Sequence, residues 1–394
     1  MAIAFTTARI PPIHCGVGSI KHLTPWLLAN QATVVLLVTG AHSLEKSGKL
    51  AELQQLIEMA GCRLEQLRCT GEPTAELVDQ TTQIWSNHPF DAVIAVGGGS
   101  VIDLGKALAA MLPHGNSVMD HLEGVGKGLA HSGHTLPYLA IPTTSGTGGE
   151  VSKNAVLSGG GSHGFKKSLR HDNFVPSAVI LDGDLLTSTH PAVTAACGMD
   201  AFTQLLESFL SPTASALSDA IVWSGLEHLI PNILKAFSDE AQNPDVRLNM
   251  AYAALCSGIG LANAGLGIVH GMAGPIGGWY PIPHGVICGS LMASAQRQNW
   301  DHIKAHASQH PAVQKMARVG RLMPDGQDID DDQRATEHLT ATLEQWTDTL
   351  QLPRLGPYGI TNQAVDRVVA ASNNRNNPVQ LSTAEIRTIL ERRL

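Results

Sequence analysis

The sequence has little charge. Only 15% of its 394 residues are Asp, Glu, Lys or Arg, against about a quarter in an ordinary globular domain, while 43% are hydrophobic. A chain of this composition can bury a large core, which argues against intrinsic disorder. Its few charges sum to −8 and form no basic stripe, which argues against a dedicated nucleic-acid binder.

The patterns of membrane and secreted proteins are also missing. No run of about 18 apolar residues occurs, so we expect no membrane span. Residues 1–13 show no basic segment followed by an apolar one, so we expect no secretion signal. The six cysteines form no CxxC pair and no zinc-ribbon spacing. We therefore expect a cytoplasmic protein whose cysteines are reduced and serve as small buried hydrophobes.

Glycine is the residue in excess. The chain holds 39 glycines among 394 residues, against a usual share of roughly 7%. Without a collagen-like period, this excess indicates many tight turns of the backbone. The run Gly159-Gly160-Gly161 predicts the tip of a surface loop.

The pattern of apolar residues changes along the chain. Short apolar runs alternate with helical stretches in the first half, at 33–39, 91–96, 136–141 and 178–181. Such alternation is typical of a parallel sheet covered by helices, which binds ligands at the carboxyl ends of its strands. After residue 185 only helical periodicity remains. We predict an α/β domain at 1–185 and an all-helical domain at 186–394.

A glycine-rich turn follows the second apolar run. The segment AVGGGSVIDLGK leads from a strand through Gly97, Gly98, Gly99 and Ser100 into a helix. The N–H groups at a helix N-terminus attract a phosphate, and glycine lets the phosphate approach closely. A tight turn without a ligand is the alternative, since the segment is neither GxGxxG nor a Walker loop.

A second loop, PTTSGTGGE at 142–150, follows the third apolar run. Hydroxyl groups among glycines at the carboxyl end of a strand suit ribose or phosphate oxygens. A flexible Ser/Thr/Gly loop is the equal alternative.

Metal-ligand residue types occur in the helical half. Asp200 and Gln204 lie four residues apart and so share one helix face, and His270 and His284 follow later. A carboxylate with imidazoles suits a divalent transition metal. With 18 histidines in the chain, a chance pair of hydrogen-bonded structural histidines is the alternative.

Taken together, these motifs resemble the iron-containing (group III) alcohol dehydrogenases, which have the dehydroquinate synthase-like fold. Residues 97–106 resemble the diphosphate-binding turn of that family, 142–151 its PTTxGTGSE loop, and 198–208 and 270–285 its metal-binding stretches. The resemblance implies an N-terminal Rossmann-like nucleotide-binding domain, a C-terminal helical domain and an active site in the cleft between them.

The resemblance also assigns residues. The dinucleotide would be held by Gly97 to Ser100 with Asp103, its nicotinamide side lined by Thr143, Thr144 and Thr147, and its ribose approached by Lys166, with Lys167 as the fallback. A divalent metal, Fe²⁺ first and Zn²⁺ second, would take Asp200, Gln204, His270 and His284 as ligands. Asp200, His270 and His284 are also the expected catalytic residues.

Two positions depart from the family. It usually has His where this chain has Gln204, and an amide oxygen is a weaker donor than imidazole. It also often has His, near the substrate, at the position of Gly274. A subgroup shares both features. We expect an altered proton relay rather than a loss of hydride chemistry, because the cofactor motifs are intact.

A third departure concerns the choice of cofactor. After the first apolar run, many NAD-preferring relatives carry an Asp that would bond the ribose 2′-hydroxyl and repel a 2′-phosphate. Here the position is Gly40, with His42, Lys46 and Lys49 nearby. We therefore expect NADP slightly more than NAD.

The resulting prediction is an NAD(P)-dependent, metal-assisted alcohol dehydrogenase or aldehyde reductase. It would transfer a hydride between nicotinamide and a small alcohol or carbonyl, act as a homodimer, and bind neither nucleic acid nor membrane. One alternative is a metal-independent reductase similar to the maleylacetate reductases. The other is a non-catalytic nucleotide-binding sensor, which Gln204 and Gly274 would favour.

Overall fold

The computed structural model describes residues 4–159 and 164–394. Gly160 and Gly161, part of the predicted loop tip, lie outside the described residues, while Gly159 ends a strand. The chain forms two compact units. One contains Arg9–Thr189 and Gln242–Leu255, and the other contains the N-terminal segment to Ala8, His190–Ala241 and Cys256–Leu394.

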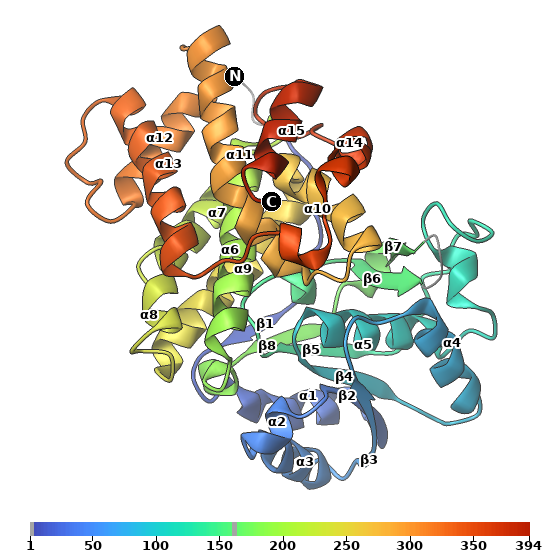
Figure 1. Cartoon of the computed structure of the whole chain (residues 1–394). Helices are drawn as coiled ribbons and strands as arrows, with labels where there is room; N and C mark the ends of the chain where they lie inside the picture. Colours follow the sequence, from blue (N-terminus) through green and yellow to red (C-terminus); the bar gives the residue numbers. More distant parts are fainter. Residues whose placement is uncertain (1–3, 160–163) are drawn as a thin grey trace. The chain divides into compact units, whose positions relative to one another are not determined.

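The first unit is built on a parallel sheet of six strands in the order β1-β8-β5-β4-β2-β3 (Figure 1). The strands are β1 (Ile13–Cys15), β2 (Val34–Gly40), β3 (Arg63–Cys69), β4 (Ala92–Gly97), β5 (Tyr138–Pro142) and β8 (Ala178–Leu181). The four predicted apolar runs are β2, β4, β5 and β8, which are the inner strands. An inner strand of such a sheet is buried on both faces, so its sequence is continuously apolar.

Helices cover this sheet, and a small hairpin stands beside it. The helices are α1 (Leu23–Ala29), α2 (Ser43–Lys46), α3 (Lys49–Met59), α4 (Ala75–Ile84) and α5 (Gly99–Met111). The hairpin pairs β6 (Asn154–Gly159) with β7 (Phe165–Arg170) in antiparallel fashion. Because all strands of the main sheet are parallel, β2, β4 and β5 end at the same edge, at Gly40, Gly97 and Pro142.

The second unit is built from helices, and its described residues form no strand. Its helices are α6 (Pro191–Leu210), α7 (Ala216–Leu229), α8 (Ile233–Phe237), α10 (Ile268–Trp279), α11 (His284–His306), α12 (Ala312–Leu322), α13 (Asp332–Thr349), α14 (Asn362–Ala371) and α15 (Thr383–Glu391). The helix α9 (Pro244–Ala264) contributes its first part to the sheet unit and its last part to the helical unit. Short 3-10 helices lie at Ser19–His22, Val118–His121, Gly149–Val151, Asp172–Phe174, Gly183–Leu186 and Gly356–Tyr358.

Local sequence sets the bounds of α6, which carries the first predicted metal ligands. Its N-cap is His190, whose ring nitrogen Nδ1 accepts a hydrogen bond from the N–H of Ala192 at 3.2 Å. Pro191 takes the first helical position, where a missing N–H costs nothing. The helix ends at Leu210, before the Ser-Pro pair that predicted its end. Asp200 therefore lies mid-helix, on a rigid and buried element.

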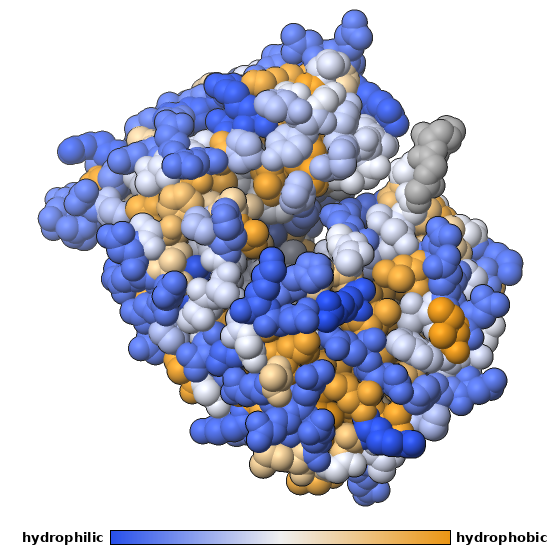
Figure 2. Space-filling view, turned by 60° about the horizontal axis from the view of Figure 1, so that its bottom comes forward, coloured by the Kyte–Doolittle hydropathy of each residue, from blue (hydrophilic) through white to orange (hydrophobic). Residues whose placement is uncertain are grey.

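Apolar residues go mainly to the interior of the two units. Figure 2 shows one face, on which hydrophilic residues predominate and hydrophobic ones are scattered among them. Among residues 4–159 and 164–394 no single helix has both the length and the apolar character to cross a membrane. By length and composition alone, α9 and α10 meet that requirement as a pair, with a bend of 99° between them.

Candidate functional site

The glycine-rich turn joins β4 directly to α5. A Cβ on Gly97 would lie 2.5 Å from Cγ2 of Val101, so no larger residue fits without a shift. The helix then begins at Gly99, and its N-cap residue, Gly98, offers no side chain to bond the first N–H groups. The N–H of Val101 donates to the carbonyl of Gly98 at 2.9 Å. The N–H groups before it are placed to bind an anion, which the positive end of the helix dipole also favours.

The threonine-rich loop lies against this turn. The N–H of Thr143 donates to the carbonyl of Gly97 at 2.9 Å, directly after β5. A Cβ on Gly98 would lie 3.3 Å from Thr144, and one on Gly99 would lie 3.1 Å from Oγ1 of Thr147. The small size of these glycines thus lets the two loops meet. The structure brings the predicted cofactor residues of both loops to one edge of the sheet.

Asp103 and Lys166 form a charged group beside these loops. Lys166 lies on β7, and its Nζ pairs with Oε1 of Glu72 at 2.6 Å. Burial raises the pKa of Asp103, while the charges of Lys106 and Lys166 oppose that shift. Lys167, the fallback, is exposed, because neighbouring residues of a strand point to opposite sides. Glu72, which the sequence analysis missed, is the partner that orients Lys166.

A second missed residue, Lys106, anchors the far end of the threonine-rich loop. Its side chain is 1% exposed. Its Nζ donates at 2.7 Å to each of three carbonyl oxygens, those of Gly149, Ser152 and Asn154. Three carbonyl oxygens around one nitrogen suit the charged ammonium, which holds this stretch of backbone in place. A lysine about two turns into the helix that follows the glycine turn was the available signal.

Gly40 ends β2 at the same sheet edge. A Cβ on it would meet only Oγ of Ser43 at 3.8 Å and Cγ2 of Val101 at 3.9 Å, so a side chain could be accommodated. Arg68 of β3 lies beside it. One guanidinium nitrogen of Arg68 donates to the carbonyl of Ala41 at 3.4 Å, and another pairs with Glu45 at 3.0 Å. Lysines near Gly40 were predicted from the sequence, but this arginine was not.

Three predicted metal ligands converge in the helical unit. Asp200 comes from α6, His270 from α10 and His284 from α11. Nε2 of His270 lies 3.3 Å from Oδ1 of Asp200, and Nε2 of His284 lies 3.7 Å from the same oxygen. Gln204 lies one turn after Asp200 on α6 and is 2% exposed.

The structure adds Cys288 to this cluster. Its Sγ lies 3.6 Å from Nε2 of His270 and 3.6 Å from Nε2 of His284. One ligand atom each from Asp200, His270, His284 and Cys288 can be chosen so that all four lie within 4.8 Å of one another. The signal in the sequence was the spacing of four residues from His284, which places both side chains on one face of α11.

A buried carboxylate orients His270. Oε2 of Glu207 lies 2.7 Å from Nδ1 of His270, and Oε1 accepts the N–H of Val269 at 2.7 Å. A proton on Nδ1 leaves Nε2 with its lone pair directed at the cluster, the usual arrangement of a metal-binding histidine. Glu207 was also missed, although it lies seven residues after Asp200 on the same helix face.

The chemistry of these donors fits a metal cation. Asp200 is 1% exposed, and no donor among the described residues makes a well-aligned hydrogen bond to its Oδ1. A buried carboxylate oxygen without a donor is costly, and a cation would satisfy it. Burial would raise the pKa of Asp200, but His284 and His270 lower it. The side chain is therefore an anion ready to bind a metal.

Metal binding must compete with a proton on His270. Burial would lower the pKa of His270, but Cys288, Asp200 and Glu207 raise it well above its ordinary value. A ligating imidazole has to be neutral at the atom that binds, so metal uptake releases protons and weakens at acidic pH.

Two further features lie apart from these donors. Gly274 lies on α10, one turn after His270, and a Cβ there would have no heavy atom within 4 Å. Space for a Cβ therefore exists, but the position carries no side chain. A pocket of about 450 Å³ lies near the amino end of β5, lined by Leu136, Tyr138 and Phe174 among others. It is at the opposite end of that strand from the threonine-rich loop, so we do not assign it to the cofactor.

Comparison with known proteins identifies the family. The family model described as "Iron-containing alcohol dehydrogenase" matches residues 11–183, and the model of the C-terminal part of "Fe-containing alcohol dehydrogenase family" matches residues 194–394. The chain belongs to the iron-containing alcohol dehydrogenase family. The resemblance seen in the sequence is confirmed, whereas the subgroup with Gln at the position of one His stays a prediction.

Individual members of the family are similar along the whole chain. Long-chain-alcohol dehydrogenase 1 of Geobacillus thermodenitrificans is 30% identical over 98% of this chain and 96% of its own. A solved 1,3-propanediol oxidoreductase is 25% identical, with a TM-score of 0.85 over 100% of both chains. A sulfoacetaldehyde reductase of Bifidobacterium kashiwanohense, solved with NAD⁺, is 25% identical, with a TM-score of 0.84 over 100% of this chain and 99% of its own.

Membership confirms the coarse predictions. The fold is the α/β plus all-α architecture predicted above, and this iron-containing alcohol dehydrogenase family member is an oxidoreductase that acts on CH–OH groups. The family implies NAD(P), a divalent metal and small alcohols or aldehydes as substrates.

Proposed function

We propose that this protein is a metal-assisted, NADP-preferring alcohol dehydrogenase that also catalyses the reverse reaction, the reduction of an aldehyde. The observation that supports it is the convergence of Asp200, His270 and His284 around a buried carboxylate oxygen without a donor. A site of this kind, in a family of CH–OH oxidoreductases, suits the binding of a divalent metal beside an alcohol oxygen.

The bound groups supply the chemistry, and the chain holds them. When bound, the nicotinamide exchanges the hydride and the metal polarises the substrate oxygen. In this proposal the turn Gly97–Ser100 and the start of α5 bind the diphosphate. Asp103 helps this turn to hold the dinucleotide. Thr143, Thr144 and Thr147 line the nicotinamide, and Lys166 approaches the ribose. Glu207 keeps His270 in its ligating orientation.

The proton of the alcohol substrate is transferred without the help of a side chain at position 274. Gly274 offers no acid or base, and its surroundings leave room for solvent. We propose that the ribose hydroxyl of the cofactor, or water, carries the alcohol proton there. His270, held by Glu207, serves as a ligand and not as the relay.

The preference for NADP rests on charge at the end of β2. Gly40 itself carries no carboxylate to repel a 2′-phosphate, and the guanidinium of Arg68 lies beside Ala41, where Glu45 pairs with it at 3.0 Å. Arginine suits phosphate because of its fixed charge and planar donors. NAD stays the alternative, and the similar sulfoacetaldehyde reductase was solved with NAD⁺.

The decisive experiment is a panel of alcohols and aldehydes, with NADPH and NADH, on protein loaded with Fe²⁺, with Zn²⁺ or with no metal. We expect turnover of at least one carbonyl, faster with NADPH, and only with metal. Equal turnover without metal would favour the metal-independent reductase. Binding of NADPH without turnover of any carbonyl would favour the sensor, for which Gln204 and Gly274 are the supporting residues.

Three further expectations join this proposal. We propose that the predicted domains, 1–185 and 186–394, hold the dinucleotide and the metal respectively. We also propose a homodimer and a cytoplasmic location, without nucleic-acid or membrane partners. Light scattering of the purified protein at several concentrations tests the dimer, and a monomeric mass throughout would contradict it.

A further inference from the structure

We propose that Cys288 is a direct ligand of the metal ion, which gives the site an Asp-His-His-Cys donor set. The inference rests on the metal site of the proposed function. It adds a thiolate that was not among the metal ligands predicted from the sequence or from the family resemblance. Cys288 then supplies the fourth ligand as a strong donor. The other candidate for this ligand, Gln204, offers only a neutral amide oxygen.

The spacing of the donor atoms supports a single shared ion. With metal–nitrogen and metal–oxygen bonds of about 2.1 Å and a metal–sulfur bond of about 2.3 Å, a tetrahedral site has N···S edges of about 3.6 Å and N···O edges of about 3.4 Å. Sγ of Cys288 lies 3.6 Å from both Nε2 atoms. Oδ1 of Asp200 lies 3.3 and 3.7 Å from the same two nitrogens.

The surroundings of Cys288 argue against a purely structural role in the hydrophobic core. Cys288 is 0% exposed, yet its Sγ lies 3.6 Å from each of two imidazole nitrogens and within the same cluster as a carboxylate. An inert buried cysteine has apolar neighbours. The carboxylate oxygen in the same group lacks a hydrogen-bond donor and is 1% exposed at the residue level, which independently points to a cation.

A metal-bound Cys288 would be a thiolate, because a metal ion deprotonates a thiol that coordinates it. The Sγ–H proton is lost to solvent and the sulfur lone pair forms the bond to the metal. The ion and its four donors then sum to zero charge, beside the buried carboxylate of Glu207 that holds His270. No oxidant or reductant is needed, and one proton is released for each thiolate formed.

The donor set predicts a metal preference. Thiolate is a soft ligand that binds Zn²⁺ and Co²⁺ in preference to Fe²⁺. A site made only of carboxylate and imidazole discriminates less against Fe²⁺. We therefore expect Zn²⁺ to bind more tightly than Fe²⁺. Four protein donors leave the substrate oxygen to enter as a fifth, an expansion known for catalytic zinc.

Cobalt substitution tests the ligand directly. The full chain, stripped of metal, is titrated anaerobically with Co²⁺ while the near-ultraviolet and visible absorption are recorded. We expect one Co²⁺ per chain and an intense thiolate-to-cobalt charge-transfer band. Cys288→Ser should abolish the band and weaken Zn²⁺ binding by about 10–100-fold or more, while Cys256→Ser, at a cysteine that is also 0% exposed in the helical unit, should keep both.

A second pair of measurements guards against a variant that misfolds. Cys288→Ser should bind NADPH as the unaltered protein does, which shows that its sheet unit is folded. Its circular dichroism should also be unchanged, which shows that its helices are intact. X-ray absorption of the unaltered zinc protein should show one sulfur at about 2.3 Å. Stoichiometric metal without the band and without the sulfur would overturn the role of Cys288 and leave the metal-assisted function standing. No metal binding at all would overturn both.

Discussion

At the residue scale, three glycines differ in what a side chain would meet. A Cβ at Gly97 collides with Val101, one at Gly40 makes ordinary contacts, and one at Gly274 has open space. The first position therefore requires glycine for packing, whereas the other two could have held a side chain. Their glycines remove a functional group rather than relieve a clash, which makes each of them a separate test of the proposed chemistry.

Replacing Gly97 by alanine should disturb the phosphate-binding turn. The added Cβ would approach Cγ2 of Val101 to 2.5 Å, so α5 must move away from β4. We expect a loss of about 1–3 kcal/mol in the free energy of unfolding, typical of overpacking, and at least a tenfold weaker binding of NADPH. Urea denaturation and fluorescence titration measure the two effects. Gly115→Ala is the matched control, since a Cβ there has nothing within 4 Å.

Replacing Gly40 by aspartate should reverse the cofactor preference. The site has room for a side chain, and a carboxylate at the end of β2 would repel a 2′-phosphate and accept a 2′-hydroxyl. We expect kcat/KM with NADPH to fall by about tenfold or more, which is about 1.4 kcal/mol, while kcat/KM with NADH is kept or improves. Gly40→Asn, of similar size without the charge, is the control. An unchanged NADPH to NADH ratio would contradict the proposal that the 2′-phosphate lies at this position.

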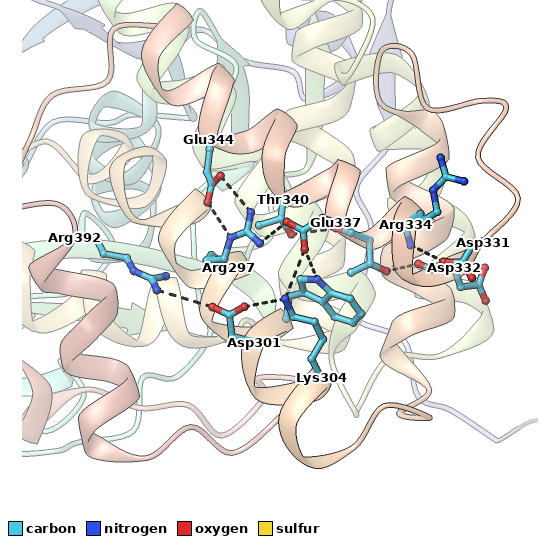
Figure 3. Close-up of polar contacts among 12 residues, drawn as sticks. Arg297, Asp301, Lys304, Asp331, Asp332, Arg334, Glu337, Thr340, Glu344 and Arg392 are labelled. Carbon is cyan, nitrogen blue, oxygen red and sulfur yellow. Dashed lines mark hydrogen bonds and ion pairs between the residues drawn. The ribbon is translucent and has the colours of Figure 1, made fainter.

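At the element scale, a polar network joins α11 to α13 (Figure 3). The guanidinium of Arg297 on α11 donates two hydrogen bonds to the carboxylate of Glu344 on α13, at 3.0 and 3.2 Å. It also contacts Glu337, which in turn accepts the indole N–H of Trp300 at 2.7 Å. These bonds raise the pKa of Arg297 further and lower that of Glu337. The network therefore clamps α13 to the same helix that carries His284 and Cys288.

Removing this clamp should destabilise the helical unit by a modest amount. Arg297→Met should cost about 1–2 kcal/mol in urea denaturation, because the two glutamates are about half-exposed and partly screened. Arg297→Lys should cost less, since it keeps the charge but loses the fork. Arg334→Met, at an exposed arginine on α13, is the control. A cost for Arg297→Met no greater than that for Arg334→Met would show that the network contributes nothing.

The start of α15 holds a carboxylate that should make stability depend on acid. Burial would raise the pKa of Glu385, but hydrogen bonds from Ser382 and the contact with His302 at 2.7 Å lower it to about 2. A carboxyl whose pKa is depressed on folding stabilises the protein above its unfolded pKa and loses that effect as the pH falls toward the folded value. The loss therefore falls between about pH 5 and pH 2.

The matching variant is Glu385→Gln, which keeps a capping side chain without the charge. At pH 6 it should unfold more easily than the unaltered protein by about 1–2 kcal/mol, measured by urea denaturation. At pH 3.5 the difference should shrink, because the unaltered carboxyl has begun to lose its advantage. A difference that stays constant between the two pH values would contradict this account.

The elements themselves could be predicted from the sequence to different degrees. The inner strands were predicted because burial on both faces makes them continuously apolar. The edge strand β3, with its sequence RLEQLRC, and the hairpin of β6 and β7 were missed, because one exposed face keeps their residues polar. Lys106 and Cys288 were missed for another reason. Their roles depend on neighbours distant in sequence, which periodicity does not report.

At the scale of the whole molecule, the two sets of functional residues divide between the two compact units. All the proposed dinucleotide residues lie in Arg9–Thr189, and all the proposed metal ligands lie in the helical segments from His190 onward. The motifs could be predicted because each is short and continuous in the sequence. The metal cluster brings together three helices, so its full membership required the fold.

This division predicts that each ligand stabilises its own unit first. A ligand stabilises the state that binds it, by about 2.7 kcal/mol at a hundredfold excess over its Kd. Hydrogen exchange measured by mass spectrometry should therefore slow in α6, α10 and α11 when Zn²⁺ is added. With NADPH it should slow at the start of α5 and in residues 143–149.

The variants separate these two effects. Asp200→Asn removes the anionic oxygen of the metal cluster, so it should abolish the protection by Zn²⁺ and keep the protection by NADPH. Gly97→Ala should do the reverse, because its clash lies between β4 and α5 in the sheet unit. Protection by Zn²⁺ that appears in the sheet unit and spares α6, α10 and α11 would place the metal elsewhere. It would then contradict the assignment of Asp200, His270 and His284 as ligands.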